Sequence, residues 1–100
     1  MGYNLSFLPL AAQDILDIEA SLYEFSPTAS ERHTNEIDCL TKTLTEHPFM
    51  YQAFKDDPFY RSMPLCYDYR LFYHVAEVTK TIEIHRVLHG TMNLEFHLSK

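Results

Sequence analysis

The chain has 100 residues, of which 46% are hydrophobic and 14% aromatic, and its formal net charge is −6. This length fits one globular domain over residues 1–100 with a modest core, and this composition excludes a disordered chain. No stretch approaches the roughly 18 consecutive apolar residues of a membrane span, and the N-terminus lacks a basic segment followed by an apolar one. We therefore expect a cytoplasmic domain without membrane contact.

The charge is unevenly distributed along the chain. Residues 1–50 contain two basic and eight acidic residues, whereas residues 51–100 contain six of each. This balance argues against non-specific binding of nucleic acid but leaves room for a local cationic site in the second half. Cys39 and Cys66 are too few for a disulfide framework or a cysteine metal site, so we interpret both as small buried residues.

The first half of the chain predicts a strand followed by two helices. Residues 3–8 alternate between apolar and polar side chains, as in a half-buried strand, and Pro9 ends that strand. Apolar residues three and four apart predict a helix over residues 10–25. Its apolar stripe consists of Ala11, Ile15, Leu16, Ile18, Leu22 and Phe25.

A second helix is predicted to begin at Ser26-Pro27 and to end near Glu46. Serine is a favoured N-cap, and proline is favoured at the first helical position. The apolar stripe of this helix consists of Ala29, His33, Ile37, Leu40 and Leu44. Because Ser26-Pro27 is the only break between the two helices, they should form an antiparallel hairpin.

The second half predicts three strands. Residues 49–58 have no clear period and are interpreted as an irregular segment over one end of the core. Residues 59–65 are predicted to form an edge strand, since Pro64 cannot donate a hydrogen bond to a neighbouring strand. Two alternating runs within residues 67–89 flank a polar turn at 77–80 and predict a hairpin of two strands.

The predicted order is therefore β-α-α-β-β-β. Helices near the start and strands gathered at the end favour an α+β fold, with an antiparallel sheet and the helical hairpin packed on one face. Residues 91–100 form a short tail that could dock back through Leu94, Phe96 and Leu98.

Alternation sorts the strand hairpin into two faces. The face expected to pack against the helices carries Tyr67, Tyr69, Leu71, Tyr73, Val75, Ile82, Ile84, Arg86 and Leu88. The opposite face, expected to be open to solvent, carries Asp68, Arg70, Phe72, His74, Thr81, Glu83, His85, Val87 and His89.

The open face has two interpretations. It is either a solvated set of cross-strand ion pairs, or a surface that binds phosphate or cleaves RNA. Histidine and arginine can together supply the base, the acid and the fixed cations that RNA cleavage requires. The histidines lack the spacing of known metal sites, so we expect no metal and no cofactor.

Three segments carry a resemblance to a known family. Its opening strand and helix are similar to YNLSFLPLAAQDILDIEASLYEF, its central Y-R-[LIV]-[FVI]-Y-x-V block resembles FYRSMPLCYDYRLFYHV, and its last strand resembles TIEIHRVLHGTMNL. The family is the RelE/ParE superfamily of toxins from bacterial type II toxin–antitoxin systems, often called plasmid stabilisation proteins. The match covers nearly the whole chain and implies the β-α-α-β-β-β fold.

The resemblance implies a toxin neutralised by an antitoxin encoded beside it. RelE-like members are mRNA interferases, metal-independent endoribonucleases that act in the ribosomal A site, whereas ParE-like members poison DNA gyrase. For RNA cleavage it implies that Arg70 contacts the scissile phosphate and that Arg61 supports it from the preceding strand. In that mechanism His89 would be the acid or base, and His85 or Glu83 would support it.

Three departures from the family pattern bear on the activity. Thr91-Met92 stand where the family usually has two arginines, Arg61 is the only basic residue between Phe59 and Leu65, and no tyrosine follows Tyr73. Three alternatives therefore stay open. They are RelE-like inhibition of translation by mRNA cleavage, which we place first, a ParE-like gyrase poison without enzymatic activity, and a weakened member that only binds an antitoxin.

Under each alternative, a partner is expected to lay a helix or strand over the open face of the sheet. The candidate contacts are Phe72, His74, Arg86 and Val87.

Overall fold

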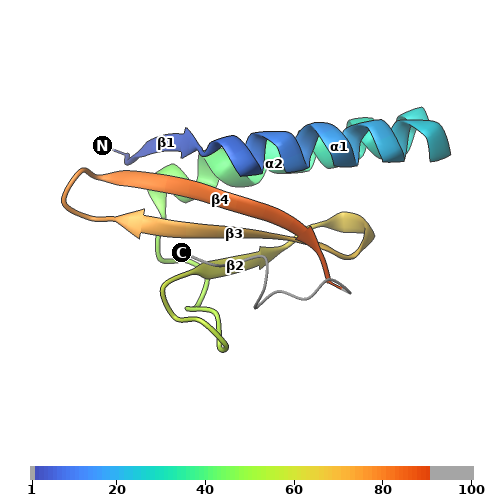
Figure 1. Ribbon diagram of the computed structural model, residues 1–100. Coiled ribbons are helices and arrows are strands. Elements are labelled where there is room, and N and C mark those ends of the chain that lie inside the picture. The colour runs from blue at the N-terminus through green and yellow to red at the C-terminus, as the bar shows by residue number, and fades with distance from the viewer. Residues whose placement is uncertain (1, 91–100) are drawn as a thin grey trace.

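The computed structural model describes residues 2–90 of the chain. Its elements are β1 (Asn4–Phe7), α1 (Pro9–Phe25), α2 (Pro27–Glu46), β2 (Arg61–Pro64), the 3-10 turn η1 (Cys66–Asp68), β3 (Tyr69–Ala76) and β4 (Thr81–His89). Figure 1 shows the two helices together on one face of the sheet. The predicted α+β fold and its element order are confirmed.

The predicted docking of the tail lies outside the described residues. No helix within residues 2–90 is long and apolar enough to cross a membrane.

The sheet is mixed rather than antiparallel. Its four strands lie in the order β1-β4-β3-β2, and both β2 and β4 run antiparallel to β3. β1 instead lies parallel to β4, with Leu5 opposite Ile82 and Phe7 opposite Ile84. The prediction of a fully antiparallel sheet is therefore wrong at β1. Alternation within a strand indicates which face is buried, but it carries no information on direction relative to a strand far away in the sequence.

Local signals set the ends of the helical hairpin. Pro9 begins α1, where a missing backbone N–H costs nothing. The Ser26 hydroxyl caps α2 by accepting a hydrogen bond from the Ala29 N–H at 3.3 Å. The Ser30 hydroxyl then donates to the Glu19 carbonyl of α1 at 3.0 Å, which joins the two helices near the turn.

The main core fills the space between the helices and the sheet. Its buried side chains include Ala11, Ile18, Leu22, Ile37, Leu44, Met63, Leu71, Tyr73, Ile82, Ile84 and Val87. Leu16 and Phe25, predicted for the buried stripe, are instead 61% and 81% exposed. Leu16 lies two residues from Ile18 and so points away from the sheet, while Phe25 is the last residue of α1. Cys39 is also exposed, contrary to prediction, and Cys66 is half-buried.

A bulge in β4 interrupts the alternation of the strand hairpin. Before it, the predicted faces are confirmed, since Tyr73 lies opposite Ile84 and both face the helices. The next pair toward the end of β4 is Phe72 with Arg86, so His85 is an extra residue without its own partner. From this point, each side chain of β4 lies on the face opposite to the one predicted.

The bulge exchanges Val87 and Leu88 between the two sides of the sheet. Val87, predicted on the open face, is buried in the main core, as its place opposite a core residue of β3 requires. Leu88, predicted to face the helices, is buried on the other side with Tyr60 and Phe72 in a second, smaller core. Alternation misplaced both residues because it assumes a strand without an insertion.

Asp14 of α1 binds β4 beyond the end of β1. Its carboxylate accepts hydrogen bonds from Arg86 Nε at 2.7 Å and from Arg86 Nη2 at 2.9 Å. The same carboxylate accepts the backbone N–H of Val87 at 3.0 Å. The hydrogen bond to Asp14 raises the pKa of Arg86. Because both side chains are about five-sixths buried and paired with each other, Arg86 does not offer a guanidinium to a partner as predicted.

We expect Asp14→Ala to lower the free energy of unfolding by about 2–3 kcal/mol, because it leaves a largely buried guanidinium and a backbone N–H without their acceptor. Asp14→Asn keeps one oxygen acceptor and should lose less. Asp17→Ala, an exposed carboxylate on the same helix, should change stability by no more than about 0.5 kcal/mol. Urea unfolding measures all three, and equal stability of Asp14→Ala and Asp17→Ala would contradict the assignment.

Candidate functional site

Arg70 is the cation of the open face that borders a concave surface. It lies near the start of β3, opposite Pro64 of β2 and Leu88 of β4. Its Nη2 donates a hydrogen bond to the Ser62 hydroxyl at 3.0 Å. The side chain is half-buried and separates two concavities of about 350 and 420 Å³.

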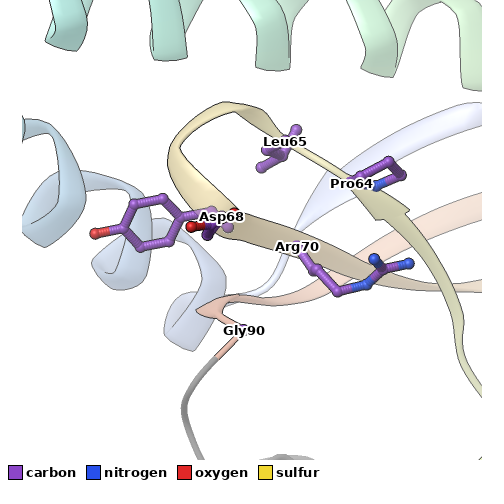
Figure 2. Close-up of a pocket in the computed structure, with 6 residues that line it drawn as sticks. Pro64, Leu65, Asp68, Arg70 and Gly90 are labelled. Carbon is purple, nitrogen blue, oxygen red and sulfur yellow. The ribbon is translucent and has the colours of Figure 1, made fainter.

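The first concavity lies at the end of the sheet, between η1 and the last residues of β4. It is lined by Pro64, Leu65, Asp68, Tyr69, Arg70 and Gly90. Figure 2 shows Arg70 on its strand, Asp68 on the turn that precedes it and Gly90 at the end of β4 around this hollow. The hollow therefore combines one cation and one carboxylate.

The second concavity lies on the other side of Arg70. It is lined by Tyr51, Gln52, Ala53, Phe54, Lys55, Ser62, Pro64 and Arg70. Lys55 adds a second cation, and no carboxylate of residues 2–90 lines this hollow. It therefore suits an anionic group better than the first does, because both charged residues in its wall are positive. Lys55 carries no signal in the sequence, because the segment that contains it shows no period.

Arg61 does not join Arg70. It lies opposite Tyr73, so its side chain leaves the sheet on the helix-facing side. There Arg61 Nη1 donates to the Tyr51 carbonyl at 2.6 Å, and its guanidinium lies 4.8 Å from the centre of the Phe49 ring. The prediction that both arginines contact one phosphate is therefore corrected. Tyr73, opposite Arg61, lies three residues from Arg70 on β3, so the two arginines point to opposite faces of the sheet.

His74 and His85 form an aromatic group on the open face, which we call the histidine cluster together with Phe59, Tyr60 and Glu83. The His74 ring stacks on Phe59 with centroids 3.9 Å apart, and its Nδ1 lies 2.9 Å from the Phe59 carbonyl oxygen. The His85 ring lies edge-on to Tyr60 at 5.2 Å. Its Nε2 is 3.2 Å from a carboxylate oxygen of Glu83.

The histidine cluster is separate from Arg70. Arg70 and His74 are four residues apart on β3, which corresponds to about 13 Å along the strand. The buried Phe72 lies between them. A general acid or base must come within hydrogen-bond reach of the reacting group. His85 directs its ring to Tyr60 and its Nε2 to Glu83, so the predicted joint action of Arg70 and His85 on one phosphate would require His85 to leave these contacts.

His89 lies on the helix-facing side at the end of β4. It pairs with Tyr69, and the two rings meet edge to face with centroids 5.1 Å apart. Arg70 pairs with Leu88 on the other side of the sheet. The prediction that His89 shares a face with Arg70 is wrong because the bulge shifts the alternation by one residue.

Two of the predicted partner contacts are buried. Phe72 is 0% exposed and Val87 is 2% exposed. Phe72 does lie on the open side, but the Phe54 ring covers it at 5.1 Å, and Val87 belongs to the main core. Neither side chain can touch a partner in this conformation. His74, which is half-exposed, stays a predicted contact.

The turn η1 shapes the first concavity and has a strained backbone. Tyr67 and Asp68 have φ angles of 61° and 63°, a left-handed conformation that costs about 1–2 kcal/mol for each such residue. Two hydrogen bonds from other elements hold the turn. The Cys66 N–H donates to Glu36 of α2 at 2.7 Å, and the Gly90 N–H donates to the Asp68 carbonyl at 2.8 Å. β3 consequently begins two residues later than the predicted strand.

Two solved structures share this fold. The toxin–antitoxin complex RelBE2 from Mycobacterium tuberculosis has a TM-score of 0.62 and 19% sequence identity, covering 89% of this chain and 99% of that chain. The toxin RelE from E. coli, a mutant solved in the free state, has a TM-score of 0.66 and 17% identity, covering 96% of this chain and 92% of that chain. At these identities the likeness establishes the fold alone.

No curated protein sequence matches the chain. The family model described as the ParE toxin of the type II toxin–antitoxin system, parDE, matches residues 5–94. This range covers most of the chain, from within β1 to beyond the end of β4, and it confirms the resemblance predicted from three segments. The chain therefore belongs to the ParE toxin family of type II toxin–antitoxin systems.

Proposed function

We propose that this toxin acts in the ParE manner, by binding and poisoning a protein target such as DNA gyrase, and that a cognate antitoxin neutralises it. The observation that carries the proposal is the separation of Arg70 from the other candidate catalytic residues. Arg61 and His89 lie toward the helices, and His85 belongs to the histidine cluster. The sequence alone places RelE-like mRNA cleavage first, whereas this geometry favours ParE-like binding.

Cleavage of RNA needs several groups around one phosphate. A base, an acid and fixed cations must all lie within hydrogen-bond reach of the reacting atoms. The open-face positions of β2 beside Arg70 carry Ser62 and Pro64, and neither is cationic. An arginine without an acid or base beside it still binds an anion well, so the arrangement favours recognition over catalysis.

The charge of the chain supports a protein target. Docking into ribosomal RNA depends on neutralising many phosphates with basic side chains. The formal net charge of −6 opposes such docking. One or two carboxylates of a protein partner, by contrast, can bind at Arg70 and Lys55 in the second concavity.

RelE-like cleavage of mRNA is the second candidate. The specific observation in its favour is the first concavity, where Arg70 lies across from Gly90 at the end of the last strand. In that mechanism Arg70 would contact the scissile phosphate, and His89 would act as acid or base after turning toward it.

Inducible expression in a bacterial host distinguishes the two candidates. We expect growth arrest accompanied by gyrase-linked DNA breaks and an SOS response, while mapped mRNA ends stay unchanged. Co-expression of the small protein encoded by the neighbouring gene should restore growth. Ribosome-dependent mRNA ends that appear before any DNA damage would contradict the proposal and select RNA cleavage.

Substitutions of Arg70 and Arg61 distinguish an effect on target binding from an effect on protein stability. Arg70→Ala should reduce toxicity at least about tenfold while changing the free energy of unfolding by less than about 1 kcal/mol, since the partner of its guanidinium within residues 2–90 is a hydroxyl. Arg61→Ala should retain toxicity but lose about 1–2 kcal/mol of stability, because it removes a charged hydrogen bond to a carbonyl and a cation–π contact.

The readouts are growth inhibition at matched protein levels and urea unfolding of the purified variants. Arg70→Lys, which keeps the charge but not the fork of donors, serves as the matched control. Full toxicity of Arg70→Ala would show that the concavities are not the binding site.

A further inference from the structure

His33 of α2 is a buried titratable group that no proposed activity uses. Its side chain is 0% exposed, and neither ring nitrogen has a hydrogen-bond partner among residues 2–90. Its ring instead lies edge-on to the Tyr69 ring of β3, with centroids 5.4 Å apart. Burial lowers the pKa of His33 below its usual value of 6.5, so the imidazole is neutral at neutral pH.

Two carboxylates, one on each helix, act on His33. Glu36 of α2 and Glu19 of α1 attract a proton to it and oppose the effect of burial, with Glu36 the stronger. Cys66 of η1 is not a competing charge, because burial and then the hydrogen bond to Glu36 raise the pKa of its thiol to about 11. Arg32, whose charge reaches Cys66, is the cation of this region.

Glu36 interacts with both Cys66 and His33. Its carboxylate accepts the Cys66 N–H at 2.7 Å and thereby holds η1 against the second helix. The same carboxylate is the strongest electrostatic partner of His33. A protonated His33 would carry a positive charge and two N–H donors in place of one, and both would attract the Glu36 carboxylate away from its position at Cys66.

We propose that His33, Glu36 and η1 form a pH-sensitive latch, in which protonation of His33 draws the Glu36 carboxylate away from Cys66 and releases the turn. The released turn relaxes because Tyr67 and Asp68 are held in left-handed conformations only while its ends are fixed. At neutral pH the latch is closed, and acidification opens it.

Opening the latch changes the first concavity. Asp68, Tyr69 and Arg70 follow directly on Cys66 in the chain and line that hollow together with Gly90. Movement of η1 breaks the hydrogen bond from the Gly90 N–H to the Asp68 carbonyl, and movement of Tyr69 disturbs its ring contact with His89. The latch therefore couples proton binding in the core to the shape of the surface beside Arg70, whichever target the toxin has.

The direction of the pH dependence follows from the lowered pKa. The unfolded chain binds a proton at its histidine near pH 6.5, before the folded chain does. The closed state is thus fully favoured above that pH and loses stability as the pH falls toward the folded-state pKa. Local release of the turn allows His33 to be protonated without unfolding of the domain.

Amide hydrogen exchange followed by NMR on the full chain tests the latch. Between about pH 7.5 and 5, the protection factors of the Cys66 and Gly90 amides should fall at least about tenfold, while that of Leu71 in the buried centre of β3 stays constant. The midpoint should coincide with the titration of the His33 ring signals. Constant protection at Cys66, or equal loss at Leu71 and Cys66, would overturn the proposal.

Three variants make the test specific. His33→Phe keeps a ring against Tyr69 without a titrating group and should abolish the transition. Glu36→Gln keeps an oxygen for the Cys66 N–H but removes the charge, so the midpoint should move to lower pH. His47→Phe alters an exposed histidine at the end of the same helix and should leave the transition unchanged. If His33→Phe fails to fold, an unchanged midpoint in Glu36→Gln overturns the proposal by itself.

Discussion

The hydrogen bonds of Asp14 determine how the two layers of this domain fit together. β1 is only four residues long, so its parallel pairing ends at Phe7 and leaves the rest of the β4 edge without a neighbouring strand. One carboxylate from the first turns of α1 replaces it, because it accepts a backbone N–H of β4 and both guanidinium donors of Arg86. An uncovered edge would leave polar backbone groups unpaired beside the core. The helix is thereby fixed along β4, both helices stay on one face, and the other face remains available for recognition.

The bulge at His85 divides that face into regions with different chemistry. Upstream of it, the open side carries the histidine cluster, and downstream it carries Leu88 beside Arg70. Without the extra residue, His89 would lie on the same side as Arg70 and Val87 would be exposed. An arrangement closer to a nuclease site is thus one residue away in register.

The parts of the structure that the sequence predicts are those governed by local chemistry. The cap at Ser26 and the shared face of Tyr73 and Ile84 before the bulge follow from residue type and alternation, and the sequence predicts both. The direction of β1, the bulge and the left-handed turn depend on segments distant in the chain. Arg61 illustrates the effect on the site, since its residue type suggested a phosphate contact while its register turns it toward the helices. The latch around His33 was equally invisible, because an apolar stripe predicts burial without revealing which polar groups lie nearby.

The second core gives the open face a ridge as well as two hollows. Tyr60, Phe72 and Leu88, covered in part by Phe54, stiffen the middle of the sheet from the side that has no helices. Arg70 and His74 of the histidine cluster are then two separate polar sites, about 13 Å apart along β3. A partner must bring about four residues of extended chain, or about nine of α-helix, to reach both. Each site alone is small. A partner that contacts both sites binds more tightly, because its first contact raises the effective concentration of its second. The length of the partner's segment, rather than the chemistry of any one side chain, then determines whether it binds tightly or weakly.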